Sequence, residues 1–230
     1  MNNILDVENL SFHYDEYNTK TGLTTEGKSG INNITFSIPE GSFVTLCGPT
    51  GSGKSTLLNI IAGLDCATSG RVLVNGRHVQ DLKGRDMIEY RRKTLGLVFQ
   101  FHHLLKDFTA LENIYLPSYM AGTPRKQAEE RAMELLEEVG LSDRAGHLPS
   151  QLSGGERQRI AVARSLVNDP ELILADEPTG SLDPENAEQT GRLLFDMSKK
   201  HGKTLVLVTH DPTVASLGDR ILTLEKGTIA

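Results

Sequence analysis

Short runs that are apolar at nearly every position recur along the chain, and each of them ends at a glycine or a polar residue. Such runs are typical of strands that are covered on both faces in a parallel α/β sheet. They lie at residues 43–47, 95–99, 172–175 and 204–209. Because ligands of parallel α/β sheets bind at the carboxyl ends of the strands, the residues that follow these runs are the candidates for chemistry.

Other patterns flank these runs. Residues 4–10, 31–38 and 71–74 are short strand-like segments with turn signals, which predicts an antiparallel β layer beside the parallel sheet. The polar residues 15–30 predict a mobile loop inserted in that layer. Residues 124–139 carry apolar side chains at helical spacing, which predicts an amphipathic helix.

The length of 230 residues suits one α/β domain. We predict a single domain over residues 1–230, in which residues 1–100 and 161–230 form the core together with the antiparallel layer. Residues 101–160 are predicted to form a helical subdomain.

The composition is that of an ordinary globular protein, with 38% hydrophobic and 23% charged residues. A net charge of −6 and the absence of a basic run argue against nucleic acid or an anionic membrane as a direct partner. No apolar stretch has the length of a membrane span, and the N-terminus lacks the pattern of a signal peptide. Two cysteines provide no disulfide framework, which favours a reducing compartment. Any contact with a membrane is therefore expected to be indirect, through other subunits.

Residues 48–56 form a glycine-rich loop between a strand-like run and an apolar helical run. Glycines at 48, 51 and 53 allow successive backbone N–H groups to point at one anion. Lys54 can reach the outer phosphates of a triphosphate, and the Ser55 hydroxyl suits Mg²⁺. A merely flexible glycine loop would not need that strand and helix context. The predicted nucleotide-binding residues of this phosphate loop are Gly48, Pro49, Thr50, Gly51, Ser52, Gly53, Lys54, Ser55 and Thr56.

Polar residues follow three of the apolar runs. Asp176 and Glu177 follow one run, where Asp176 suits a metal ion and Glu177 suits the water that attacks a γ-phosphate. His210 follows a second run and could contact the γ-phosphate or orient water. Gln100 follows a third and could touch both metal and water. Each of them alone is an ordinary polar residue at a strand end, but together they indicate one site.

Residues 153–156 have the spacing of a capping box, in which Ser153 accepts from a helical amide and Glu156 reaches back. A well-capped helix explains these two residues. It does not explain Gly154 and Gly155 in the first turn, where each glycine costs about 1 kcal/mol relative to alanine. Close approach of an anion to the helix N-terminus would explain them. From these residues alone, both interpretations remain open.

Residues 152–158 resemble the signature loop of ABC-type ATPases. The other motifs of that family follow in the same order: Walker A at 48–56, the Q-loop glutamine at Gln100, Walker B at 172–177, the D-loop at 181–183 and the switch histidine at His210. The resemblance covers nearly the whole chain. It implies a P-loop NTPase (RecA-like) core with a parallel sheet, an N-terminal antiparallel β layer and a helical subdomain that carries the signature loop.

The resemblance also implies a function, which is the hydrolysis of ATP with Mg²⁺. Its catalytic residues would be Glu177, His210, Lys54 and Gln100, and its metal ligands Ser55, Gln100 and Asp176. The family pattern further implies a head-to-tail homodimer on nucleotide binding, in which Ser153, Gly154 and Gly155 complete the partner's site. The adenine-stacking aromatic of the family maps to Tyr14, for which an ordinary edge-strand tyrosine is the alternative.

Residues 99–105 and 107–113 are similar to one branch of this family, whose ATPases serve lipoprotein release, macrolide export and cell division. This likeness implies a subunit that drives lipoprotein release or related mechanical export. It would lie peripherally on the cytoplasmic side of the bacterial inner membrane, bound to integral membrane subunits. The alternatives are the ATPase of another ABC exporter or importer, a soluble ABC ATPase acting on ribosomes or DNA, and a nucleotide sensor that scarcely hydrolyses ATP.

Overall fold

A computed structural model describes residues 2–18 and 23–229, and over residues 14–29 it describes only the backbone. Its central sheet has six strands in the order β10-β9-β3-β8-β7-β6. The strands from β9 to β6 are parallel, and β10 is antiparallel to β9. The strands are β3 (Phe43–Cys47), β6 (Leu95–Phe99), β7 (Leu172–Asp176), β8 (Thr204–Val208), β9 (Arg220–Glu225) and β10 (Thr228–Ile229). The predicted parallel sheet is therefore confirmed.

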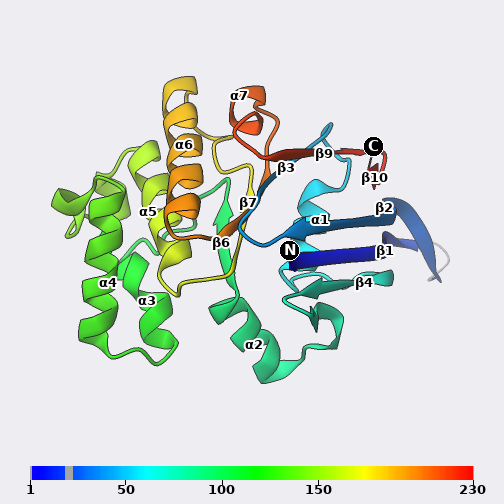
Figure 1. The fold of residues 1–230 in the computed structure, drawn as a ribbon, viewed down its shortest axis with the longest axis horizontal. Coiled ribbons are helices and arrows are strands. Elements are labelled where there is room, and N and C mark those ends of the chain that lie inside the picture. Colours follow the sequence, from blue (N-terminus) through cyan, green and yellow to red (C-terminus); the bar gives the residue numbers. More distant parts are fainter. Residues whose placement is uncertain (1, 19–22, 230) are drawn as a thin grey trace.

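A second, antiparallel sheet has the order β2-β1-β4-β5 and lies beside the central sheet, on the right of Figure 1. Its strands are β1 (Asn3–Asn18), β2 (Leu23–Pro39), β4 (Ser69–Val74) and β5 (Arg77–His78). This confirms the predicted antiparallel layer.

The prediction of a loop over residues 15–30 is wrong. β1 and β2 continue as a long hairpin, in which Asp15 pairs with Glu26 and Asn18 pairs with Leu23. Residues 19–22 lie outside the described residues. The polar composition misled the prediction because two strands satisfy each other's backbone N–H and C=O groups whatever their side chains. β-branched residues such as Thr24 and Thr25 also favour strands.

Two apolar clusters cover the two faces of the central sheet, and alternate residues of one strand belong to different clusters. In β7, Leu172 and Leu174 pack with α1 and the antiparallel layer. Ile173 and Ala175 pack with the helices on the other face. The continuous apolar run of this strand therefore reflects burial on both faces.

The helices divide between these layers, and α3, α4 and α5 gather on the side of the molecule away from the antiparallel sheet (Figure 1). They are α1 (Lys54–Ile61), α2 (Gly84–Lys93), α3 (Ala110–Met120), α4 (Arg125–Glu138), α5 (Gly154–Leu166), α6 (Pro184–Lys200) and α7 (Pro212–Ala215), with 3₁₀ turns at Val79–Asp81, Ser142–Arg144 and Pro149–Gln151. The predicted amphipathic helix is α4, whose Ala128, Ala132 and Leu135 are fully buried. The predicted helical subdomain 101–160 stays a prediction, and α5 crosses its C-terminal boundary. Among the described residues, no helix combines the length and the apolar character needed to span a bilayer.

Candidate functional site

A cavity of about 510 Å³ opens at the carboxyl ends of β3, β6, β7 and β8. Residues of the phosphate loop and of the ends of three other strands line this cavity, and they come from distant parts of the sequence. Its lining consists of Gly30, Thr50, Gly51, Gly53, Lys54, Ser55, Thr56, Gln100, Glu177 and His210. The structure thus brings most candidates of the phosphate loop together with Gln100, Glu177 and His210. Of the other candidates at these segments, Gly48, Pro49, Ser52 and Asp176 are not among the described residues that line the cavity.

The phosphate loop joins β3 to α1, and its shape depends on glycine. Gly48, Gly51 and Gly53 have φ angles of 148°, 79° and 103°, in the region that residues with a Cβ rarely adopt. A Cβ on Gly48 would lie 2.1 Å from the Leu224 carbonyl oxygen, and one on Gly53 would lie 2.2 Å from the Gly30 carbonyl oxygen. Both the conformation and the close packing of this loop therefore exclude other residues at these two positions.

Lys54 begins α1 and is buried against the loop that precedes it. Its Nζ donates hydrogen bonds of 2.9 Å to the carbonyl oxygens of Gly48 and Pro49. Two of the three ammonium donors are thereby held by the loop. The positive charge is fixed at the edge of the cavity, next to the N-terminus of α1, where an anion is favoured.

Asp176 ends β7 and faces Ser55, whose hydroxyl donates to the carboxylate. Its Oδ1 is buried and has no hydrogen-bond partner within residues 2–18 and 23–229. Burial raises the pKa of Asp176, and the hydrogen bond from Ser55 opposes that rise. A buried carboxylate oxygen without a partner, beside a hydroxyl, fits a hard divalent cation such as Mg²⁺.

Glu177 and His210 are in direct contact across the ends of β7 and β8. The Oε2 atom of Glu177 lies 2.7 Å from Nδ1 of His210. The Glu177 amide donates to the Val208 carbonyl at 2.9 Å, and its φ of 47° is unusual for a residue with a Cβ. The backbone is thus turned so that this carboxylate meets the histidine at the cavity.

Gln100 follows β6 and connects the cavity to the segment after Glu177. The Ser181 hydroxyl donates to the Gln100 carbonyl at 3.1 Å. A Cβ on Gly180 would lie 3.1 Å from Nε2 of Gln100, so a glycine leaves room for this side chain. A movement of Gln100 should therefore displace residues 180–181, and a movement of residues 180–181 should displace Gln100.

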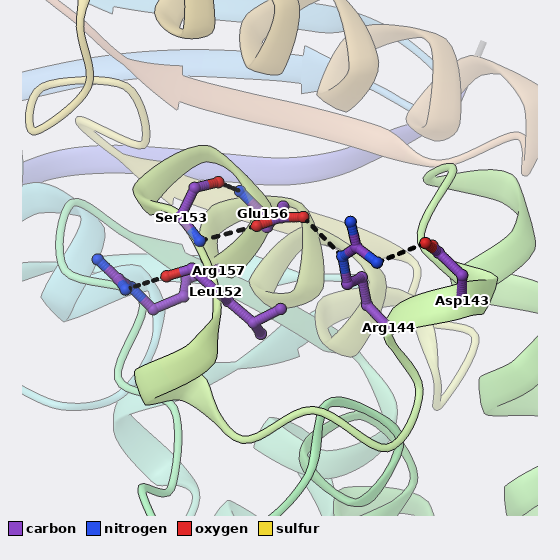
Figure 2. A network of polar contacts seen from close by, with 6 residues as sticks. All are labelled: Asp143, Arg144, Leu152, Ser153, Glu156 and Arg157. Atoms are coloured by element: carbon purple, nitrogen blue, oxygen red, sulfur yellow. Dashed lines mark hydrogen bonds and ion pairs between the residues drawn. The ribbon is translucent and has the colours of Figure 1, made fainter.

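The signature loop, residues 152–158, forms the start of α5 and contains a complete capping box (Figure 2). The Ser153 amide donates to Oε2 of Glu156 at 2.8 Å, and the Glu156 amide donates to Oγ of Ser153 at 3.2 Å. Arg157 donates to the Leu152 carbonyl and, through Nε, to Nε2 of His102 at 2.9 Å. In the part of the chain that the structure describes, residues 153–155 do not line the cavity that the phosphate loop forms.

At one position of the signature loop, the structure gives a reason for glycine that the sequence did not reveal. A Cβ on Gly155 would lie 2.7 Å from Oδ1 of Asn186, on the first turn of α6. A Cβ on Gly154 would lie 3.5 Å from Cδ2 of Leu182, which is ordinary contact. Packing within the chain therefore accounts for Gly155, whereas the approach of an anion stays a prediction for both glycines.

Sequence reasoning missed Gly30, which lines the cavity from β2. The residue lies in the segment that was expected to be a loop, and no local signal distinguishes it from other glycines. Tyr14 lies in β1, but its side chain is outside the described residues, so the stacking of adenine on it stays a prediction.

Comparisons with known proteins agree with this geometry. The family model described as ABC transporter matches residues 31–180. The chain is 55% identical over 212 residues to the lipoprotein-releasing system ATP-binding protein LolD of Treponema denticola, covering 92% of this chain and 94% of that protein. It is 53% identical over 226 residues to the protein of the same name from Treponema pallidum, covering 98% and 97%.

Two solved structures of the ATP-binding cassette MJ0796 are similar over the whole fold. One, described as a dimeric structure of a bacterial ABC transporter cassette, has a TM-score of 0.85 and 39% identity, and covers 98% of this chain and 96% of that chain. The other, a dimer in a post-hydrolysis state bound to ADP and Pi, has a TM-score of 0.85 and 38% identity with the same coverage.

Proposed function

The chain belongs to the ABC transporter family and is an ATP-hydrolysing enzyme, and from this premise we propose that it drives the release of lipoproteins from the inner membrane. The relatives that carry the name of the lipoprotein-releasing system cover more than nine-tenths of the chain at more than half identity. The observation that supports hydrolysis most strongly is the contact of Glu177 with His210 at the cavity that Lys54 and Ser55 also line.

The phosphate loop binds the triphosphate in this proposal. Backbone N–H groups of the loop, among them those of Gly51 and Gly53, and the ammonium of Lys54 surround the β- and γ-phosphates. Mg²⁺ would be held by Ser55, Asp176 and Gln100, and it would supply positive charge to the phosphate oxygens. The orphaned oxygen of Asp176 supports this assignment.

Glu177 and His210 then promote the attack of water. The Glu177 carboxylate accepts a hydrogen bond from the water, whose oxygen forms a bond to the γ-phosphorus while the bond from that phosphorus to the bridging oxygen of ADP breaks. The proton that the water loses passes to the Glu177 carboxylate and from there to the released phosphate. His210 holds Glu177 in place through the 2.7 Å contact, and in this proposal it would also contact the γ-phosphate. Catalysis consists of positioning and stabilisation of charge.

A second copy of the chain completes each site. The signature loop presents the N-terminus of α5, yet residues 153–155 are not among the described residues that line the cavity of their own chain. The two similar cassettes described above are dimers. We infer a head-to-tail homodimer in which Ser153, Gly154 and Gly155 of one copy face the γ-phosphate in the other.

In this proposal the chain contacts the membrane only indirectly, through partner subunits. The chain would bind integral membrane subunits at the cytoplasmic face of the inner membrane, as a peripheral subunit. The names of the relatives support this assignment. An affinity-tagged chain recovered from detergent-extracted membranes should carry these subunits in stoichiometric amount, and recovery without any membrane protein would contradict the assignment.

The hydrolytic role is tested by Glu177→Gln. This variant should still bind ATP but release phosphate at least about 100-fold more slowly, because the group that polarises water is lost. It should also accumulate as an ATP-bound dimer in size-exclusion chromatography. The control is Glu137→Gln, which changes an exposed carboxylate of α4 and should leave turnover intact. Wild-type turnover in Glu177→Gln would exclude the proposed role.

A further inference from the structure

The capping carboxylate of the signature loop is itself held by a second side chain, which lies outside the nucleotide cavity (Figure 2). Arg144, on the 3₁₀ turn Ser142–Arg144, donates through Nε to Oε1 of Glu156 at 3.0 Å. The other oxygen of Glu156 accepts from the Ser153 amide. Arg144 also forms an ion pair with Asp143. Both oxygens of Glu156 are therefore engaged, and its side chain is fixed in one orientation.

The electrostatics of Glu156 reflect this arrangement. The hydrogen bond from the Ser153 amide lowers the pKa of Glu156, and the hydrogen bond from Arg144 adds to the effect, to a pKa of about 2. Only 19% of the Glu156 side chain is exposed. The residue is thus a firmly ionised carboxylate at the start of α5, where the helix dipole also favours negative charge.

The fixed capping box prepares Ser153 for an acceptor. The Oγ atom of Ser153 accepts from the Glu156 amide, so its own hydroxyl hydrogen points elsewhere and can be donated. The box uses the amides of Ser153 and Glu156, and it does not use those of Gly154 and Gly155. These remaining donors match a phosphate group, but the nearby carboxylate of Glu156 would repel one unless its charge is offset.

We propose that Arg144 is a positioning residue for ATP hydrolysis. It holds Glu156 so that the hydroxyl of Ser153 is correctly aimed, and it offsets the carboxylate charge that an incoming γ-phosphate of the partner would meet. The inference rests on the proposed function, because the signature loop must meet nucleotide in a second copy. Arg144 acts through Glu156 and Ser153 and does not itself touch the substrate.

A merely structural ion pair makes a different prediction. The Arg144 side chain is 38% exposed and that of Glu156 is 19% exposed, so the pair is half-buried and contributes modestly to folding stability whatever its role. If the pair is only structural, its loss should therefore change ADP affinity, dimerisation and turnover slightly and to a similar extent. Loss of a positioning residue should impair closure of the dimer and turnover, and spare the binding of nucleotide to the phosphate loop.

The test compares Arg144→Ala and Arg144→Lys with Arg131→Ala, which removes a half-buried arginine that is paired with Glu134 on α4. In the Glu177→Gln background, Arg144→Ala should raise the ATP concentration needed for dimerisation about tenfold. In the otherwise native chain it should lower kcat about tenfold, while ADP affinity measured by calorimetry stays unchanged. Arg144→Lys keeps the charge and should recover part of the loss, and Arg131→Ala should behave as the native chain.

The combination with Glu156→Gln separates charge from packing. Because this substitution removes the carboxylate charge, adding Arg144→Ala to it should cost little more than Glu156→Gln alone. Additive losses, unchanged dimerisation in Arg144→Ala, or an equal loss of ADP affinity would each overturn the inference. If the Glu177→Gln chain fails to dimerise with ATP while Arg144 is intact, the proposed function fails instead.

Discussion

The chain contains two glycine-rich loops at helix N-termini, and they are built in opposite ways. The phosphate loop relies on backbone conformation, since Gly48, Gly51 and Gly53 have positive φ and α1 begins without a side-chain cap. The signature loop relies on side chains, since α5 begins under a complete capping box and Gly154 and Gly155 keep negative φ or extended backbone.

We relate this difference to how each loop meets nucleotide. The phosphate loop would surround the phosphates, whereas the signature loop would contact a nucleotide that is already bound to another copy. The uncapped amides and Lys54 of the phosphate loop face a cavity of the same chain. The signature loop is held by Glu156 and Arg157 in a fixed shape before any ligand arrives. We infer that the first loop binds nucleotide alone and that the second acts only when a second copy supplies nucleotide.

Of the substitutions that distinguish the two loops, Lys54→Ala should have the largest effect, which is a loss of ADP affinity. Loss of a charged hydrogen-bond donor worth up to about 3 kcal/mol should weaken ADP binding to the isolated chain about 100-fold. The matched change in the other loop, Ser153→Ala, should leave ADP affinity unchanged while it slows ATP turnover. Calorimetric titration of both variants with ADP measures the contrast. Equal weakening by the two substitutions would mean that both loops bind nucleotide within one chain.

Gly155→Ala should have an intermediate effect. Its Cβ would press on the Asn186 side chain, which donates through Nδ2 to Asp183 at 2.7 Å, so this side chain must move and its hydrogen bond at the start of α6 is disturbed. We expect ATP turnover to fall about tenfold, with little change in melting temperature because alanine favours a helix by about 1 kcal/mol. Gly154→Ala has room for its Cβ and is the control, with a smaller loss of turnover. Equal losses would show that bare backbone, and not packing against Asn186, is what both glycines provide.

Glu156→Gln should have the smallest effect of these substitutions. We expect it to change how the melting temperature depends on pH. The pKa of Glu156 is lowered to about 2 in the folded chain, so its charge stabilises the fold above the unfolded pKa of about 4.3. This stabilisation is lost as the pH falls from that value toward 2. The variant should therefore melt a few degrees lower than the native chain at pH 7, and the gap should narrow progressively between pH 4 and pH 2. A gap that does not change with pH would assign the stability to packing.

The sequence predicts the parts of the fold and the cavity that depend on local patterns. The strand, loop and helix around residues 43–61 and the apolar run that ends at Asp176 can be recognised from consecutive residues, because conformation and burial there follow from residue type. The positions of Gln100, Glu177 and His210 at one cavity follow from the rule that parallel strands share a carboxyl edge.

The features that the sequence did not predict depend on contacts between distant segments. The hairpin of β1 and β2 is stabilised by backbone pairing, which a polar sequence does not reveal. Gly30 lies at the cavity, where its carbonyl packs closely against Gly53 of the phosphate loop. The need for glycine at 155 likewise arises from Asn186 on another helix. In each case the reason for the residue lies outside its own segment.

The arrangement that we infer is one in which each nucleotide lies between the phosphate loop of one copy and the signature loop of the other. It is tested most directly by a crystal structure of the Glu177→Gln chain with Mg–ATP. We expect a γ-phosphate oxygen within about 3 Å of both Lys54 Nζ of its own copy and the Ser153 hydroxyl of the other copy. A γ-phosphate bound at Lys54 with no Ser153 hydroxyl of either copy in hydrogen-bond range would contradict it.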